Sequence, residues 1–487
     1  MADEPSDSGS TLDRLPTGVP GFDVVLGGGL VRGGTSLVLG EPGTGKTTLG
    51  NQLAFRHGEA GNTTLFVTVL AEPHDRMLRH IDGFAFFAPD QVGRTVHFLS
   101  LYDELRAQGL DGSLALLRRL IRQYGATLVI IDGAGRFEDF APSPGEHRRF
   151  VAELHVQLAV LECTAVLLTQ SGNGGDALHG LGTHVDGIVI LEDQSVDDRA
   201  VRRLRIVKLR GSDTVRGWHQ FAITDEGIEV YPRLEATAPL TRPEVRGPRR
   251  RLPLGIAGLD DMLRGGVLTG STTLVLGPPG IGKTTVGLHF IDAGAERGER
   301  GMIAGFQEAP DRLLAKAEGL GLRDHVEAGR VRIGWQPSAE GPLDGWAHGL
   351  LAAIDAHRPE RLLVDALTDA AQLPAAEGRW SGFVAALAHA LRGRGVTAVF
   401  TAETRTGEAS EDPLPEVAPA IDNALVLRYA EPRSRLHRLI SVARSRDSGF
   451  DPETREFEIT DHGIEVASSA ESARSALDGP ARPADGG

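Results

Sequence analysis

Two stretches of this sequence carry residue types at a spacing that suits the binding of a polyphosphate. Residues 40–47 and residues 277–284 both fit the pattern G-x-x-x-x-G-K-[ST], and each follows a short apolar run typical of a strand. In this pattern the glycines let backbone N–H groups turn inward around the phosphates, the lysine reaches the outer phosphates, and the hydroxyl binds Mg²⁺. We therefore predict two nucleotide-binding loops. Their predicted contacts are Gly40, Gly43, Thr44, Gly45, Lys46, Thr47 and Thr48 in the first loop, and Gly277, Gly280, Ile281, Gly282, Lys283, Thr284 and Thr285 in the second.

An aspartate follows a second apolar run behind each loop. Asp132 comes after residues 128–131, and Asp365 comes after residues 361–364. A carboxylate at the tip of a neighbouring strand orients Mg²⁺ and its waters, so we predict metal sites formed by Thr47 with Asp132 and by Thr284 with Asp365. The alternative is that each aspartate only caps the next turn.

Hydrolysis also needs a group that orients and deprotonates the attacking water. Two Asp-Arg pairs, at 75–76 and 311–312, lie after the strand that follows each loop helix, and each has a glutamate three positions before its aspartate. These glutamates, Glu72 and Glu308, are the predicted catalytic bases. An exposed acid at a strand end is the alternative.

Basic residues alternate near the end of each half of the chain. Lys208 and Arg210 are matched by Arg444 and Arg446, and alternation along a strand places both charges of a pair on one face. Arginine suits phosphate recognition, so these pairs are predicted to act on the γ-phosphate of a neighbouring subunit. Solvent-facing charge on a strand is equally compatible with the pattern.

Other polar residues are weaker candidates. Gln170 and Glu403 stand at strand ends where they could sense the γ-phosphate, although polar strand ends are common. The 16 histidines show no metal-ligand spacing, and His289 suggests a helix face. The only cysteine, Cys163, lies in an apolar context that indicates packing.

The elements that position these residues are short β-rich runs alternating with longer helical patterns. This order predicts an α/β fold with a mainly parallel twisted sheet flanked by helices. The pattern occurs twice: Leu15 matches Leu252 and Lys46 matches Lys283 at a constant offset of 237 positions. We predict two tandem domains at 12–232 and 251–467, a disordered arm at 1–11, a linker at 233–250 and a disordered tail at 468–487.

Composition places the chain among soluble folded proteins, with 41% hydrophobic and 24% charged residues. The single cysteine, the absence of a signal peptide and the lack of a long apolar stretch favour the cytoplasm and no membrane association. The net charge of −15 makes nucleic acid an unfavourable partner, although the linker arginines keep a local contact open.

The combination of motifs resembles the KaiC group of the RecA superfamily. The resemblance rests on the phosphate loops, the Asp132 strand, and above all the segments 208–211 and 223–228, and it covers both repeats. It implies two RecA-like P-loop domains, ATP and Mg²⁺ as ligands, ATPase activity, and a hexameric double ring with nucleotide between subunits. It also implies regulation through protein partners.

Two departures from the family pattern bear on activity. The family commonly has two adjacent glutamates where this chain has Ala71-Glu72 and Gln307-Glu308, so slow turnover is expected. Ala418 and Pro419 stand where phosphorylated hydroxyl residues would be needed, so autokinase activity is not expected. The alternatives are a nucleotide-gated scaffold with little turnover and a recombinase or helicase-type DNA-dependent ATPase.

Overall fold

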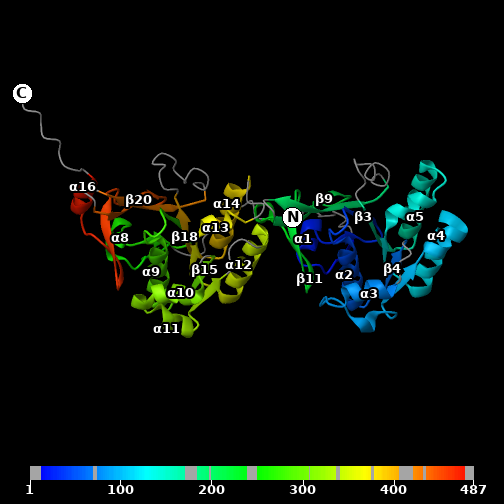
Figure 1. The fold of residues 1–487 in the computed structure, drawn as a ribbon, viewed down its shortest axis with the longest axis horizontal. Coiled ribbons are helices and arrows are strands. Elements are labelled where there is room, and N and C mark those ends of the chain that lie inside the picture. The colour runs from blue at the N-terminus through cyan, green and yellow to red at the C-terminus, as the bar shows by residue number, and fades with distance from the viewer. Residues whose placement is uncertain are drawn as a thin grey trace, which may run out of the picture. The chain divides into compact units, whose positions relative to one another are not determined.

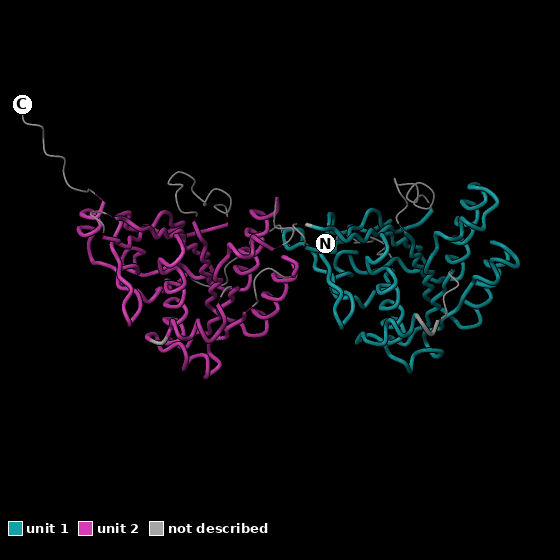
Figure 2. The backbone as a smooth tube through the Cα atoms, in the orientation of Figure 1, with its two compact units in different colours: residues 1–237 teal, residues 238–487 magenta. Residues whose placement is uncertain are grey.

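The computed structural model describes residues 13–69, 74–170, 184–196, 199–237, 249–306, 308–335, 341–373, 378–404, 420–431 and 435–477. The chain divides into two compact units, residues 1–237 and residues 238–487 (Figure 2). Each unit is described by itself below.

The first unit is built on a nine-stranded sheet of order β11-β10-β9-β8-β3-β7-β6-β4-β5. The six strands from β8 to β5 are parallel, and β9, β10 and β11 continue the sheet in antiparallel fashion. The strands are β3 (Thr35–Gly40), β4 (Thr64–Thr68), β5 (Val96–Ser100), β6 (Leu128–Asp132), β7 (Thr164–Gln170), β8 (Gly187–Val196), β9 (Arg199–Leu209), β10 (His219–Thr224) and β11 (Gly227–Tyr231), with a small separate pair β1 (Arg14–Leu15) and β2 (Leu30–Val31).

Helices cover both faces of this sheet (Figure 1). Leu49 and Leu53 of α2 pack with Phe66 and Ile130 on one face, whereas the alternate residue Val129 packs with α4 and α5 on the other. This alternation is the expected consequence of a strand buried on both sides. The helical elements are α1 (Phe22–Leu26), α2 (Lys46–Glu59), α3 (His74–Ile81), η1 (Pro89–Gln91), α4 (Tyr102–Tyr124), η2 (Ala134–Phe140), α5 (Pro144–Val160) and α7 (Leu234–Thr237).

The second unit repeats this design, with sheet order β16-β15-β17-β18-β14-β19-β20-β21-β22. Its strands are β12 (Arg251–Leu252), β13 (Val267–Leu268), β14 (Thr272–Gly277), β15 (Gly301–Gly305), β16 (Val331–Trp335), β17 (Arg361–Asp365), β18 (Thr397–Glu403), β19 (Asn423–Ala430), β20 (His437–Ser445), β21 (Arg455–Thr460) and β22 (Gly463–Val466). Its helical elements are α8 (Ala257–Met262), α9 (Lys283–Ala295), α10 (Pro310–Lys316), η3 (Glu318–Leu320), α11 (Leu322–Glu327), α12 (Leu343–His357), α13 (Leu367–Ala370), α14 (Trp380–Gly393) and α16 (Glu471–Leu477). The predicted fold class, two tandem RecA-like α/β domains with mainly parallel sheets, is confirmed.

The structure departs from the predicted boundaries at two places. Helix α7 occupies the start of the predicted linker, because Leu234 is buried against the first unit. Helix α16 lies within the predicted disordered tail, where Ala473 and Ala476 are buried. Both helices are short, and small residues such as these alanines give little sequence signal of burial. The predicted arm at 1–11 lies outside the described residues.

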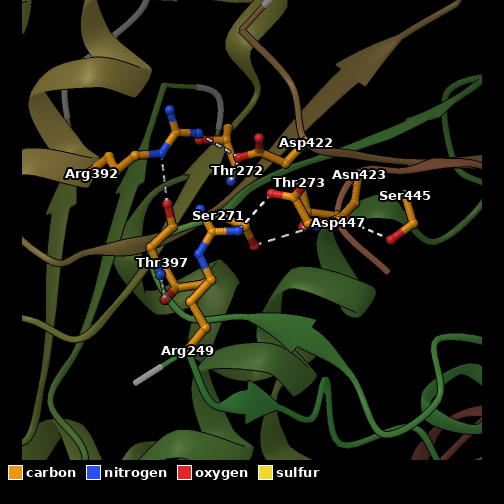
Figure 3. Close-up of polar contacts among 11 residues, drawn as sticks. Arg249, Ser271, Thr272, Thr273, Arg392, Thr397, Asp422, Asn423, Ser445 and Asp447 are labelled. Atoms are coloured by element: carbon orange, nitrogen blue, oxygen red, sulfur yellow. Dashed lines mark hydrogen bonds and ion pairs between the residues drawn. The ribbon is translucent and has the colours of Figure 1, made fainter. Parts of the chain in front are cut away.

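A polar network fixes the amino-terminal ends of β14 and β19 (Figure 3). The Asp422 carboxylate accepts hydrogen bonds from the Thr272 backbone N–H at 2.9 Å and from the Arg392 guanidinium at 2.6 Å. Asn423 donates to the Thr273 hydroxyl at 3.1 Å and accepts from the Ser445 hydroxyl at 2.9 Å. The network therefore sets the register of the strands that begin here.

Among the helices in the described part of the chain, none combines the length and the apolar character that a membrane span requires.

Candidate nucleotide-binding sites

Each predicted phosphate loop joins a buried parallel strand to the start of a helix. The first connects β3 to α2 and the second connects β14 to α9. Gly45 and Gly282 have positive φ angles of 94° and 119°, which strongly favour glycine. A Cβ atom on Gly45 would also lie 2.7 Å from Ile223 Cδ1 of β10, and one on Gly282 would lie 3.0 Å from Ile459 Cδ1 of β21. Glycine is therefore required here by conformation and, most strictly at Gly45, by close packing.

The loop lysines lie at the amino-terminal ends of these helices. Lys46 Nζ donates to the carbonyl oxygens of Gly40 at 2.7 Å and Glu41 at 2.8 Å, and Lys283 Nζ donates to that of Pro278 at 2.9 Å. Burial lowers the pKa of both lysines, while nearby carboxylates act in the opposite direction. Each ammonium group is thus directed at its own loop, where a phosphate would need it.

The structure brings each predicted metal-binding aspartate to its threonine. The Thr47 hydroxyl donates to Asp132 Oδ2 at 2.9 Å, and the Thr284 hydroxyl donates to Asp365 Oδ2 at the same distance. The contact arises because β6 and β17 end at the carboxyl edge of the sheet, where the loop also lies. A hydroxyl beside a carboxylate is an all-oxygen donor set, which fits Mg²⁺.

Asp365 has one more hydrogen-bond partner from the neighbouring strand than the register of the first unit offers to Asp132. The Thr401 hydroxyl of β18 also donates to Asp365 Oδ1, whereas Leu168 occupies the corresponding register position in the first unit. Burial raises the pKa of Asp365, and its bonds to Thr401 and Thr284 partly offset that effect. The two aspartates therefore share a contact with the threonine of their own loop and differ in their other contacts.

Of the two predicted catalytic bases, the structure describes one. Glu72 lies outside the described residues, as do Ala71 and Gln307. Glu308 is paired with Lys316 of α10 through its Oε1 atom, and its Oε2 atom is buried with no hydrogen-bond partner. Glu308 must therefore leave Lys316 before its Oε1 atom can contact a water molecule.

Residues of the second phosphate loop line a cavity of about 360 Å³. Its lining combines loop residues, the predicted metal-binding residues Thr284 and Asp365, Glu308 with Lys316, and the turn that joins β21 to β22. Glu403 at the end of β18 also lines it, with its carboxylate 3.8 Å from Lys283 Nζ. The predicted nucleotide, metal and base residues of the second repeat thus meet in one hollow.

The predicted basic pairs lie at the opposite end of their sheets from the loops. Leu209, between Lys208 and Arg210, pairs with Gly187, which pairs with Ser36 four residues before Gly40. Four strand residues span about 13 Å, so this pair is remote from the loop of its own unit. Lys208 Nζ donates to the Val185 carbonyl at 2.8 Å, and Arg210 lies 3.6 Å from Asp186. Arg444 and Arg446 occupy the matching place in the second unit. Both pairs therefore lie far from the phosphate loop of their own unit.

A β-bulge precedes each basic pair. Ile188 pairs with Lys208 and Val189 with Ile206, which leaves Val207 as the extra residue. In the second unit the same irregularity leaves Ala443 unpaired before Arg444. A bulge changes the direction of the side chains beside it. The bulge stands directly before the basic pair in both units, so it helps to set where these cations point. Residue alternation alone did not reveal it.

A side-chain clamp was also missed from the sequence. Gln52 of α2 donates to the Ile228 carbonyl at 3.0 Å and accepts from the Ile228 N–H at 2.7 Å, so it fastens the loop helix to β11. His289 of α9 accepts from the Ile464 N–H at 2.9 Å. The sequence gives one indication of this clamp: Gln52 and His289 follow their loop lysines by the same number of residues.

Cys163 is fully buried, and burial raises the pKa of its thiol to about 12. The predicted packing role agrees with this environment.

A family model described as "ATPase: KaiC" matches residues 15–235 and again residues 252–471. The chain belongs to the KaiC family of ATPases. The two matches coincide with the two units of the structure and include both phosphate loops and both basic pairs.

Individual KaiC proteins align along nearly the whole chain. The circadian clock oscillator protein KaiC of Parathermosynechococcus lividus is 28% identical over 94% of this chain and 86% of its own length. The circadian clock protein KaiC3 of Synechocystis sp. is 26% identical over 96% of this chain and 93% of its own length. The KaiC protein of Prochlorococcus marinus is 28% identical over 94% and 93%, respectively. These alignments therefore span nearly the whole of this chain.

Proposed function

We propose that this chain is a Mg²⁺-dependent ATPase of slow turnover that forms a KaiC-like double ring and regulates partner proteins in the cytoplasm. The observation that carries the proposal is the repeated arrangement at the two loops. In each, a lysine is directed at the phosphate loop and a threonine hydroxyl lies 2.9 Å from a strand-end aspartate. Membership of an ATPase family supports the same chemistry.

The proposed binding roles follow from charge and position. Lys46 and Lys283 hold the outer phosphates of ATP, and the loop N–H groups cradle them. Thr47 with Asp132, and Thr284 with Asp365, hold Mg²⁺, whose charge neutralises the phosphate oxygens when it is bound. These residues orient the nucleotide before any bond breaks.

Hydrolysis requires a base and further positive charge. Glu72 and Glu308 are proposed to orient the attacking water and accept its proton. In the second unit this requires Glu308 to leave Lys316, a rearrangement that supports slow turnover. The Lys208/Arg210 and Arg444/Arg446 pairs are proposed to contact the nucleotide of a neighbouring subunit, because they lie far from the loop of their own unit. A hexamer with nucleotide between subunits would satisfy that requirement.

Phosphate release from ATP tests this proposal. We expect Mg²⁺-dependent release by the purified chain, and its loss in a Lys46→Ala/Lys283→Ala double variant. A Glu72→Gln/Glu308→Gln variant should retain ATP binding and lose turnover. Release that is no faster from the wild-type chain than from the double lysine variant would overturn the enzymatic part.

A nucleotide-gated scaffold is the second candidate function. The pairing of Glu308 with Lys316, and of Lys283 with Glu403, favours it, because both ties restrain groups that turnover needs. Mass measurement with and without ATP, run beside the turnover assay, separates the candidates. Assembly with ATP but without turnover would establish the scaffold.

A further inference from the structure

Lys316 brings a second ammonium group to the cavity at the second phosphate loop. It is the last residue of α10, and it lines this cavity together with Lys283. Lys283 Nζ donates to the Pro278 carbonyl of its own loop at 2.9 Å. Lys316 Nζ donates instead to Glu308 Oε1, on the side chain that is proposed as the base. Two cations with different partners therefore line one cavity.

The pair of Lys316 and Glu308 lies near the predicted metal-binding carboxylate. Burial is the main cause of the raised pKa of Asp365, and of its charged neighbours Glu308 raises this pKa further and Lys316 lowers it. Both side chains are thus close enough to act on Asp365, which accepts the Thr284 hydroxyl at the loop. A terminal phosphate that shares its metal with these residues would lie beside the same pair.

The contact between Lys316 and Glu308 is one that a terminal phosphate can compete with. The Lys316 side chain is 49% exposed, and solvent screens an ion pair of this kind. A lysine also carries its charge on a flexible four-carbon stem, so its ammonium group can change partners. A phosphate group brings more negative charge than a single carboxylate does. ADP lacks the terminal phosphate and offers no such competitor at this place.

We propose that Lys316 senses the terminal phosphate of ATP at the second site: it leaves Glu308 for that phosphate and so frees the base when the complete substrate is bound. The inference rests on the proposed function and adds a phosphate-binding residue to one of its sites. With ADP bound, Lys316 stays on Glu308. Only non-covalent contacts are exchanged in this step.

The test compares the binding of ADP and of a non-hydrolysable ATP analogue by calorimetry, both with Mg²⁺. The full chain carries Lys46→Ala, so that the second site is read. We expect Lys316→Met to weaken binding of the analogue by about tenfold or more, because a charged contact to the terminal phosphate is lost. Binding of ADP should change by less than about threefold. Lys316→Gln is a second neutral variant with the same expected result, in case the first does not fold.

The first site supplies the matched control. His80 corresponds to Lys316 when Asp75-Arg76 is aligned with Asp311-Arg312, and its side chain is exposed on α3. Lys316→Met in a Lys283→Ala chain, which reads the first site, should therefore leave both affinities within about threefold of the parent.

Two kinds of failure are distinguishable. Equal weakening of the analogue and ADP at the second site, or no change in either, would overturn the inference and show that Lys316 only stabilises α10. The proposed function would stand in both cases. If the Lys46→Ala parent bound neither nucleotide, the proposed function of the second site would itself be overturned.

Discussion

Asp132 accepts the Thr47 hydroxyl at 2.9 Å, and this contact links two elements that are 85 residues apart in sequence. Its copy joins Thr284 to Asp365. The position of these carboxylates was predictable, because an acid after a short apolar run must stand at the edge of a parallel sheet. The ion pair between Lys283 and Glu403 was not predictable, because it depends on which strand lies beside the loop.

Replacing Asp132 by asparagine should reduce Mg²⁺-dependent turnover at the first site by roughly a hundredfold, because the metal and its waters lose their orienting charge. The measurement is the rate of phosphate release in a Lys283→Ala chain, which silences the second site. ATP binding should persist, since the loop N–H groups remain. Turnover within about threefold of the parent chain would contradict the metal role of Asp132.

His57 should make the first unit sensitive to mild acid. Its Nε2 atom contacts the Thr127 hydroxyl at 2.8 Å, and burial lowers its pKa to about 4 from 6.5. A folded-state pKa below the unfolded value means that the unfolded chain binds more protons, so stability is present above about pH 6.5 and is lost as pH falls toward 4. Between pH 7.5 and 5.5 the loss from this group is about 1 kcal/mol.

Native-state hydrogen exchange of the strands of the first unit measures this loss. A His57→Gln variant should show less destabilisation over the same interval, because its side chain does not titrate. His80→Gln on the exposed side of α3 is the matched control and should behave like the wild-type chain. An unchanged acid response in His57→Gln would exclude this residue as the source.

At the scale of elements, the hairpins β10–β11 and β21–β22 hold the loop helices in place. Gln52 makes two hydrogen bonds to Ile228, and His289 makes one to Ile464. Replacing Gln52 by alanine leaves a buried N–H and a buried carbonyl without partners, and each such group costs roughly 1–3 kcal/mol. We expect Gln52→Ala to lower the free energy of unfolding of the first unit by about 2 kcal/mol or more.

The other repeat supplies the matched control for this clamp. Gln52→His should retain an acceptor for the Ile228 N–H and lose clearly less stability than Gln52→Ala. Chemical denaturation of the three chains measures the difference. A loss below about 0.5 kcal/mol in Gln52→Ala would show that the clamp contributes little.

The order of strands and helices was predictable to the level of fold class, because each element is encoded by a local pattern of apolar residues. Features set by pairing between distant strands were not. The bulges at Val207 and Ala443 depend on register between β8 and β9 and between β19 and β20. Helix α16 packs through two buried alanines, Ala473 and Ala476. Its segment is rich in small and charged residues, so the sequence shows no apolar pattern that would predict a packed helix.

At the scale of the whole molecule, the basic pairs lie far from the loops of their own units, so their proposed action on a nucleotide needs a second copy of the chain. Mixing two inactive chains tests this requirement. One carries Lys46→Ala and the other Lys208→Ala/Arg210→Ala, both in a Lys283→Ala background. At mixed interfaces the intact Lys208 and Arg210 of the first chain meet the intact loop of the second, so phosphate release should rise well above the sum of the separate chains.

The mixing experiment needs one control and has one outcome that would contradict the proposal. Assembly should be confirmed by mass measurement in the presence of ATP, because chains that do not associate cannot complement each other. If the mixture assembles and stays as inactive as its components, action across subunits by Lys208 and Arg210 is wrong, and the pairs only stabilise their own strand edge.

Ile223 and Ile459 fill the space where a side chain on Gly45 or Gly282 would lie, and each belongs to the last hairpin of its unit. In the first unit the backbone passes from β11 through α7 toward the second repeat, and in the second it passes from β22 to α16. We therefore expect a change in the shape of either loop to act first on the last hairpin of its own unit, through the isoleucine that lies against the loop glycine.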